Sequence, residues 1–114
     1  MDDTKIRLVI WVGNSLDQVK SFPVEVRKDI GSGLYDAQKG DKRAGAKPFK
    51  GVGSGVFELV SRFDTNTYRT LYAVQIGERI YVFTCLPEEI EYRHVDLIKQ
   101  RYKRAVDIEK EKSQ

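Results

Sequence analysis

The alternation of apolar and polar residues divides the chain into seven regular elements, three of them in its first third. The run Ile6–Val12 is almost wholly apolar and β-branched, which predicts a strand in the interior of a sheet. A short helix follows, with Ser15 as its expected N-cap. Pro23 suits the first turn of a second helix, because its missing N–H needs no partner there, and Gly40 ends this helix. Its apolar residues recur at helical spacing: Val26, Ile30, Leu34 and Ala37.

Three strand-like runs follow one another in the second half of the chain. They are Val56–Asp64, Thr67–Ile76 and Ile80–Leu86, each rich in β-branched and aromatic residues. Thr65-Asn66 predicts a two-residue hairpin turn between the first two runs, and Gly77-Glu78-Arg79 predicts a turn before the third. The runs are therefore expected to form an antiparallel meander.

The last element is a long helix that Pro87 opens and that continues to about Lys112. The order is then strand, helix, helix, three strands, helix, which predicts an α+β fold class. If Ile6–Val12 joins the meander, the two early helices cover one sheet face and the other is left partly open. The apolar residues of the last helix fall close to one face: Tyr92, Val95, Ile98, Tyr102, Ala105 and Ile108.

One long basic loop, residues 39–55, separates the second helix from the meander. It carries five cationic residues against the single acidic residue Asp41, and it is rich in glycine. Loops of this length inside a compact domain are usually functional or disordered. The cationic residues are Lys39, Lys42, Arg43, Lys47 and Lys50.

Length and composition set the limits of the search. A chain of 114 residues predicts one domain, residues 1–114, and its net charge of +3 and pI near 9.0 permit a nucleic acid partner without requiring one. A single cysteine excludes an internal disulfide framework. Because no apolar run is long enough to span a bilayer and the first residues lack a signal-peptide pattern, we expect a cytoplasmic protein without membrane contact.

Familiar catalytic arrangements are absent from the sequence. There is one histidine, no Cys-x-x-Cys pair, no metal-ligand cluster and no P-loop, so neither a metal nor a cofactor is expected. The glycines at 51, 53 and 55 lack the flanking strand and helix of a dinucleotide site. Cys85 lies inside a strand-like run and is expected in the core, and Tyr68, Tyr72 and Trp11 are interpreted in the same way.

RNA cleavage remains open to such a chain. The 2′-OH attacks the adjacent phosphate, and the charge that develops there can be stabilised by positioned Lys and Arg side chains without histidine. A lysine in a strongly basic pocket loses its proton more easily and can serve as the base. The cationic residues on and beside the sheet are therefore the candidates.

The segment from Gly45 to Leu86 also resembles one family. The residues that carry the likeness are Lys47-Pro-x-Lys50-Gly, Glu58-Leu-x-x-Arg62-Phe, Thr67-Tyr-Arg-Thr-Leu-Tyr72 and Ile80-Tyr-Val-Phe83, and the likeness extends over roughly residues 7–105. This pattern is similar to the phage-derived branch of the HigB/RelE-type toxins. The resemblance implies a RelE-like α+β domain, β-α-α-β-β-β-α, in which a curved antiparallel sheet packs against two N-terminal helices and carries a C-terminal helix.

The resemblance also implies an activity and partners. Such a toxin is a ribosome-dependent mRNA endoribonuclease that acts by metal-independent transesterification, and its cognate antitoxin, usually a helix-turn-helix protein, forms a hetero-oligomer with it. Arg69 would then face the scissile phosphate and Arg62 would contact the same or a neighbouring phosphate. Lys47 and Lys50 would approach the RNA, one of them as general base. Lys39, Lys42 and Arg43 would attract RNA phosphates without regard to sequence.

Each of these roles has a structural alternative. Arg69 can instead bridge to Glu58 across the hairpin, Arg62 can serve cross-strand pairing, and the loop lysines can be merely solvated. Tyr68 and Tyr72 alternate with Arg69 and are expected on the opposite sheet face.

The likeness fails after the last strand. The phage-derived branch has a lysine-rich segment there, whereas this chain has Glu88, Glu89 and Glu91. Acidic residues oppose phosphate binding, so either the site is weakened, or residues at the start of the last helix compensate, or a flexible piece is missing. Tyr92 and His94 are the candidate proton donors in this segment. Two further hypotheses stay open: a non-enzymatic, ParE-like inhibitor of another target, and a general RNA-binding domain without toxicity.

Overall fold

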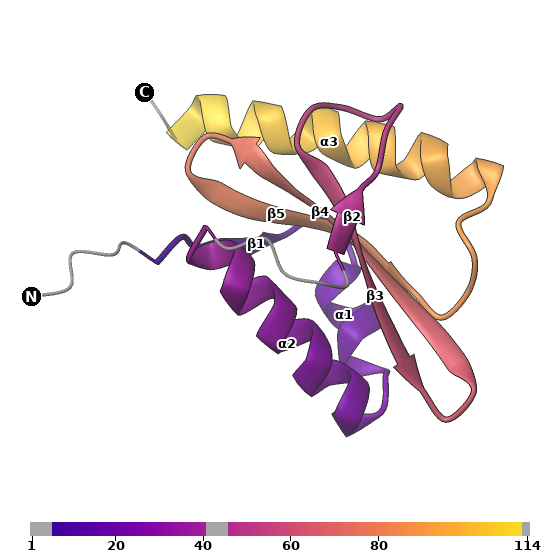
Figure 1. Cartoon of the computed structure of the whole chain (residues 1–114). Coiled ribbons are helices and arrows are strands. Elements are labelled where there is room, and N and C mark those ends of the chain that lie inside the picture. Colours follow the sequence, from indigo (N-terminus) through magenta and orange to yellow (C-terminus); the bar gives the residue numbers. More distant parts are fainter. Residues whose placement is uncertain (1–5, 41–45, 113–114) are drawn as a thin grey trace, which may run out of the picture.

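A five-stranded sheet lies between helices on its two faces in this computed structural model, which describes residues 6–40 and 46–112 (Figure 1). The strand order is β1-β5-β4-β3-β2; β1 runs parallel to β5, and the other neighbours are antiparallel. The α+β class expected from the sequence is confirmed, and the arrangement is compatible with a RelE-like fold. The sheet is mixed instead of wholly antiparallel, because β1 joins it parallel to β5. The strands are β1 Val9–Trp11, β2 Ala46–Pro48, β3 Val56–Phe63, β4 Asn66–Ile76 and β5 Arg79–Leu86; the helices are α1 Ser15–Lys20, α2 Val24–Gln38 and α3 Tyr92–Lys112.

The meander of β3, β4 and β5 has the predicted connectivity, but its first turn lies one residue earlier than expected. Asp64 and Thr65 have positive φ angles of 50° and 66°, as in the mirror-image hairpin turns whose twist matches that of the strands. Asn66 is already part of β4 and pairs with Phe63. The prediction of Thr65-Asn66 as the turn was therefore wrong, because the pairing register decides which two residues remain unpaired.

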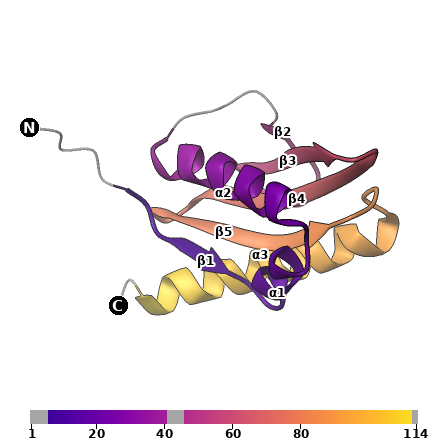
Figure 2. The same ribbon diagram turned by 90° about the horizontal axis from the view of Figure 1, so that it is seen from below.

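Both sheet edges differ from the expectation. The first strand was predicted in the sheet interior, yet among the described strands β1 pairs with β5 alone, and its residues are half-buried (Figure 2). The loop at residues 39–55 was expected to hold no strand, yet Ala46–Pro48 pairs with β3 as the opposite edge strand β2. A three-residue strand carries too little periodicity to be seen in the sequence.

Two helix starts also differ. Ser15 is the first residue of α1 rather than its cap, and its Oγ donates a hydrogen bond to the backbone oxygen of Val82 at 3.1 Å. The last helix begins at Tyr92 rather than at Pro87. The backbone N–H of Glu91 donates to Nδ1 of His94 at 2.8 Å, so a side chain in the first helical turn satisfies the group just before it.

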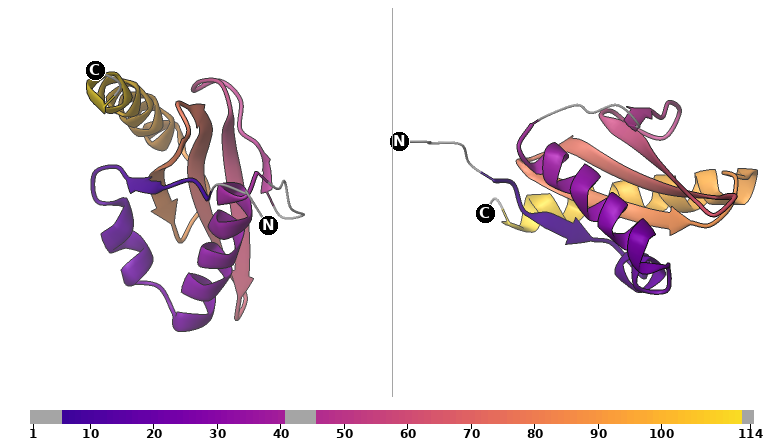
Figure 3. Two further views of the ribbon diagram at one scale, coloured as in Figure 1. Left: turned by 90° about the vertical axis from the view of Figure 1, so that its left-hand side faces the viewer. Right: turned by 60° about the horizontal axis from the view of Figure 1, so that its bottom comes forward.

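The sheet has a core on each face. Residues of α1 and α2 pack on one face, around Ile30, Tyr72 and Val82. On the other face α3 lies over β4 and β5 and buries Ile98 and Phe83 (Figure 3, left). The second face is thus covered by α3 over these strands and remains partly open beside them, as expected from the sequence. Among the described residues, no helix has the length and apolar character required to cross a bilayer.

The reactivity of the Cys85 thiol reports on the packing of the core between the sheet and helices α1 and α2. The Cys85 side chain is fully buried, and burial raises the pKa of its thiol to about 12. We therefore expect native protein to resist Ellman's reagent at pH 8, because both access and the thiolate are lacking, and to react fully in guanidinium chloride. Rapid stoichiometric reaction of the native protein would contradict the position of β5 between the two cores.

Candidate functional site

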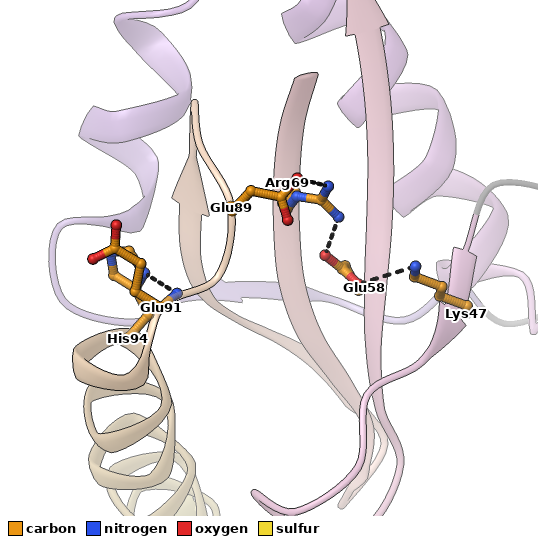
Figure 4. Close-up of polar contacts among 6 residues, drawn as sticks. All are labelled: Lys47, Glu58, Arg69, Glu89, Glu91 and His94. Atoms are coloured by element: carbon orange, nitrogen blue, oxygen red, sulfur yellow. Dashed lines mark hydrogen bonds and ion pairs between the residues drawn. The ribbon is translucent and has the colours of Figure 1, made fainter. Parts of the chain in front are cut away.

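A line of alternating charges crosses the sheet from β2 to the end of β5 (Figure 4). Lys47 on β2 places its Nζ 3.7 Å from Glu58 on β3. Arg69 on β4 donates from Nη1 to Glu58 at 2.7 Å and from Nη2 to Glu89 at 2.9 Å. Two of the predicted cations, Lys47 and Arg69, thus share one carboxylate.

Strand register brings these side chains together. Lys47 pairs directly with Glu58, and Arg69 is diagonal to Glu58 because Glu58 stands opposite Leu71. Leu86 is the partner of Arg69 on β5, so the segment that leaves β5 emerges beside Arg69 and carries Glu89 to it. The site is therefore assembled from three strands and one connecting segment.

The electrostatics of the site centre on the Arg69–Glu58 pair. The Glu58 side chain is only 6% exposed and that of Arg69 is 14% exposed, so a charge on either requires a partner. The hydrogen bond to Glu58, more than any other contact, raises the pKa of Arg69. Nε of Arg69 is buried and has no hydrogen-bond partner among the described residues. The sequence alternative of a cross-hairpin bridge to Glu58 is confirmed as a contact.

Arg69 projects from the sheet face that α3 partly covers. Tyr68 and Tyr72 lie in the core of the opposite face, as predicted, and burial raises the pKa of Tyr72 to about 12. Leu71, two residues along from Arg69, belongs to the core beneath α3. Arg62 is exposed and, by strand alternation, lies on the same face as Glu58.

The remaining predicted cations are spread more widely. Lys50 is exposed in the segment between β2 and β3. Lys39 follows α2, on the far side of the sheet, where it pairs with Asp36 at 3.7 Å and lies 4.5 Å from the ring of Tyr35. Lys42 and Arg43 lie outside the described residues.

The proposed proton donors lie at the start of α3. Tyr92 is highly exposed, whereas His94 is buried and its Nδ1 is engaged by Glu91 (Figure 4). Glu88 and Glu91 both pair with Arg93, at 3.7 and 3.1 Å. Of the three glutamates in this segment, only Glu89 pairs with one of the predicted phosphate-binding cations in the described part of the chain. The described residues also hold no cluster of three or more His, Cys, Asp or Glu suited to a metal ion.

Comparison with known proteins shows the family to which the chain belongs. The family model "Phage derived protein Gp49-like (DUF891)" matches residues 17–103, most of the chain. The chain belongs to the Gp49-like family. This is a toxin-like family of the RelE/HigB type, and membership implies a toxin–antitoxin context. No curated protein and no solved structure matches the chain.

The Gp49-like match spans all of the charged line across the sheet. Sequence reasoning found both cations of this line and named Glu58 only as an alternative partner of Arg69. It did not assign Glu89 to the site. The signal was weak: a glutamate three residues beyond Leu86 lies near Arg69 only if Leu86 is the strand partner of Arg69, and that register is not visible in the sequence.

Proposed function

We propose that this Gp49-like protein is the toxin of a type II toxin–antitoxin module and a ribosome-dependent mRNA endoribonuclease. The proposal rests on one observation. Arg69 and Lys47 both contact the carboxylate of Glu58 on one face of the sheet, and Arg62 lies on the same face. Arginine forks suit phosphate recognition, and lysine adds a point charge. Ribosome dependence, the mRNA substrate and a helix-turn-helix antitoxin partner rest on the family resemblance.

The proposed reaction is a metal-independent transesterification. The 2′-oxygen attacks the adjacent phosphorus and loses its proton to a base, for which Lys47 and Lys50 are the candidates. The bond from phosphorus to the 5′-oxygen breaks, and this oxygen takes a proton from the lysine protonated in the first step or from solvent water, which leaves a 2′,3′-cyclic phosphate and a 5′-hydroxyl. Arg69 and Arg62 stabilise the charge on the phosphoryl oxygens. Glu58 acts as a positioning residue, because it holds the Arg69 fork at the sheet surface.

The test is inducible expression in a bacterial host with mapping of mRNA 5′ ends. We choose Arg69→Gln, because glutamine retains a hydrogen-bond donor for the buried Glu58. Loss of a single group that stabilises the developing charge is expected to reduce cleavage by about 100-fold. Arg27→Gln, on the exposed face of α2, removes the same charge and should leave cleavage unchanged.

New 5′ ends inside translated frames with wild type and Arg27→Gln, but not with Arg69→Gln, would support the proposal. Equal cleavage by all three proteins would remove Arg69 from the site. A thermal melt of each purified protein separates loss of chemistry from loss of folding.

One observation favours a second function. Two carboxylates already neutralise Arg69, which suits a toxin-like inhibitor that binds another target without cutting RNA. Growth arrest with intact mRNA, unchanged by Arg69→Gln, would support this ParE-like alternative.

A further inference from the structure

The two carboxylates that hold Arg69 differ in their surroundings. Glu58 lies on a central strand, its side chain is 6% exposed, and Lys47 also contacts it. Glu89 belongs to the segment between β5 and α3, and its side chain remains 82% exposed although it is bound to Arg69. Glu89 can therefore leave Arg69 and be solvated at once, whereas Glu58 cannot.

The two contacts also use different nitrogens of the guanidinium group. Glu58 accepts from Nη1, and Glu89 accepts from Nη2. Nη2 shares an edge of the guanidinium plane with Nε, the buried nitrogen that lacks a partner among the described residues. Glu89 thus contacts one of the two nitrogens on this edge and leaves the other without a partner. A phosphodiester has two non-bridging oxygens and matches both donors.

We propose that Glu89 is an internal competitor for the phosphate site, and that its carboxylate occupies Nη2 of Arg69 until an RNA phosphate displaces it. This inference rests on the proposed function, because it takes Arg69 as the phosphate ligand. Glu58 keeps Nη1 throughout and holds the side chain in place. The glutamate-rich segment then regulates the site instead of abolishing it, and a partner that binds Glu89 would open the site.

The expected effect is modest because exposed ion pairs are weak. A pair of this kind leaves Arg69 free for roughly a fifth to a half of the time, so removing the competitor tightens phosphate binding by about two- to fivefold. Phosphate binding at one arginine also depends on salt, so all variants must be compared at one ionic strength near 0.1 M.

The experiment uses an RNA that cannot be cleaved. Fluorescence anisotropy measures binding of a labelled, fully 2′-O-methylated oligoribonucleotide to wild type, Glu89→Gln and Glu88→Gln. Glu88 is the matched control, because it is the neighbouring residue, loses the same charge and pairs with Arg93 rather than Arg69. We expect about two- to fivefold tighter binding for Glu89→Gln and a smaller change for Glu88→Gln.

A second pair of variants assigns the gain to Arg69. In the Arg69→Gln background, adding Glu89→Gln should give no more tightening than Glu88→Gln does. Equal gains from Glu89→Gln and Glu88→Gln, or a Glu89→Gln gain that persists without Arg69, would overturn the competitor while leaving the proposed function intact. Binding that is undetectable in wild type and in Glu89→Gln would overturn the competitor, and the mapping of mRNA 5′ ends then decides the proposed function separately. Binding that is insensitive to Arg69→Gln would overturn both the competitor and the role of Arg69 as phosphate ligand.

Discussion

Replacing Arg69 with alanine is expected to lower the free energy of unfolding by about 3 kcal/mol, near the lower end for a broken buried ion pair. The loss comes from Glu58, whose buried carboxylate would keep, among the described residues, only the 3.7 Å contact with Lys47. That lysine is 64% exposed and supplies weaker compensation than the 2.7 Å hydrogen bond from Arg69. Equilibrium unfolding in guanidinium chloride, monitored by Trp11 fluorescence, measures the difference.

A second substitution shows whether the uncompensated charge is the cause. Glu58→Gln in the same chain as Arg69→Ala removes the buried carboxylate, so the double variant should recover most of the lost stability. If the double variant is as unstable as Arg69→Ala alone, the loss arises from packing of the arginine stem, and the charge argument fails.

The Phe83→Ala variant is expected to lose about 3–5 kcal/mol of unfolding free energy, which is the usual cost of removing a buried aromatic ring. Phe83 is fully buried between β5 and α3, and its ring centroid lies 5.9 Å from that of Tyr102. Its backbone oxygen also accepts a hydrogen bond from Arg101 of α3 at 2.6 Å. The cavity would therefore open where α3 is anchored to the sheet.

The matched control for Phe83→Ala is Val24→Ala on α2, which removes exposed apolar surface and should change the stability by less than about 0.5 kcal/mol. Thermal and guanidinium unfolding of both variants provide the comparison. A loss below about 1 kcal/mol for Phe83→Ala would mean that α3 does not cover this face of the sheet in solution.

Arg69→Ala and Arg69→Gln together distinguish the role of Arg69 in stability from its role in phosphate binding. The Glu58 bridge makes Arg69 important for stability, so loss of toxicity in Arg69→Ala alone would not identify a phosphate ligand. Arg69→Gln retains a donor for Glu58 but lacks the charge and the fork that phosphate recognition needs. Reduced cleavage by a protein that keeps its stability would therefore report chemistry.

Local patterns predicted most of the fold. The spacing of Val26, Ile30 and Leu34 predicted α2, and three strand-like runs bounded by turns predicted the meander. The same patterns failed where the structure depends on contacts between residues that are distant in the sequence. The apolar run at Ile6–Val12 indicated an interior strand, but β1 lies at an edge. The start of α3 was placed at Pro87, because the sequence does not show that the backbone before Tyr92 is satisfied by His94.

By itself the sequence determined most of the segments that form helices and strands and which cations are available for phosphate, since these follow from neighbouring residues. The tertiary structure decided which of those cations lie close to one another and to an acidic residue. Strand register set Lys47 opposite Glu58 and Leu86 opposite Arg69, and this second pairing brings Glu89 to the guanidinium group. Register depends on the burial of whole strand faces and on pairing between distant segments. For this reason the acidic residue that faces Arg69 became visible only in the folded chain.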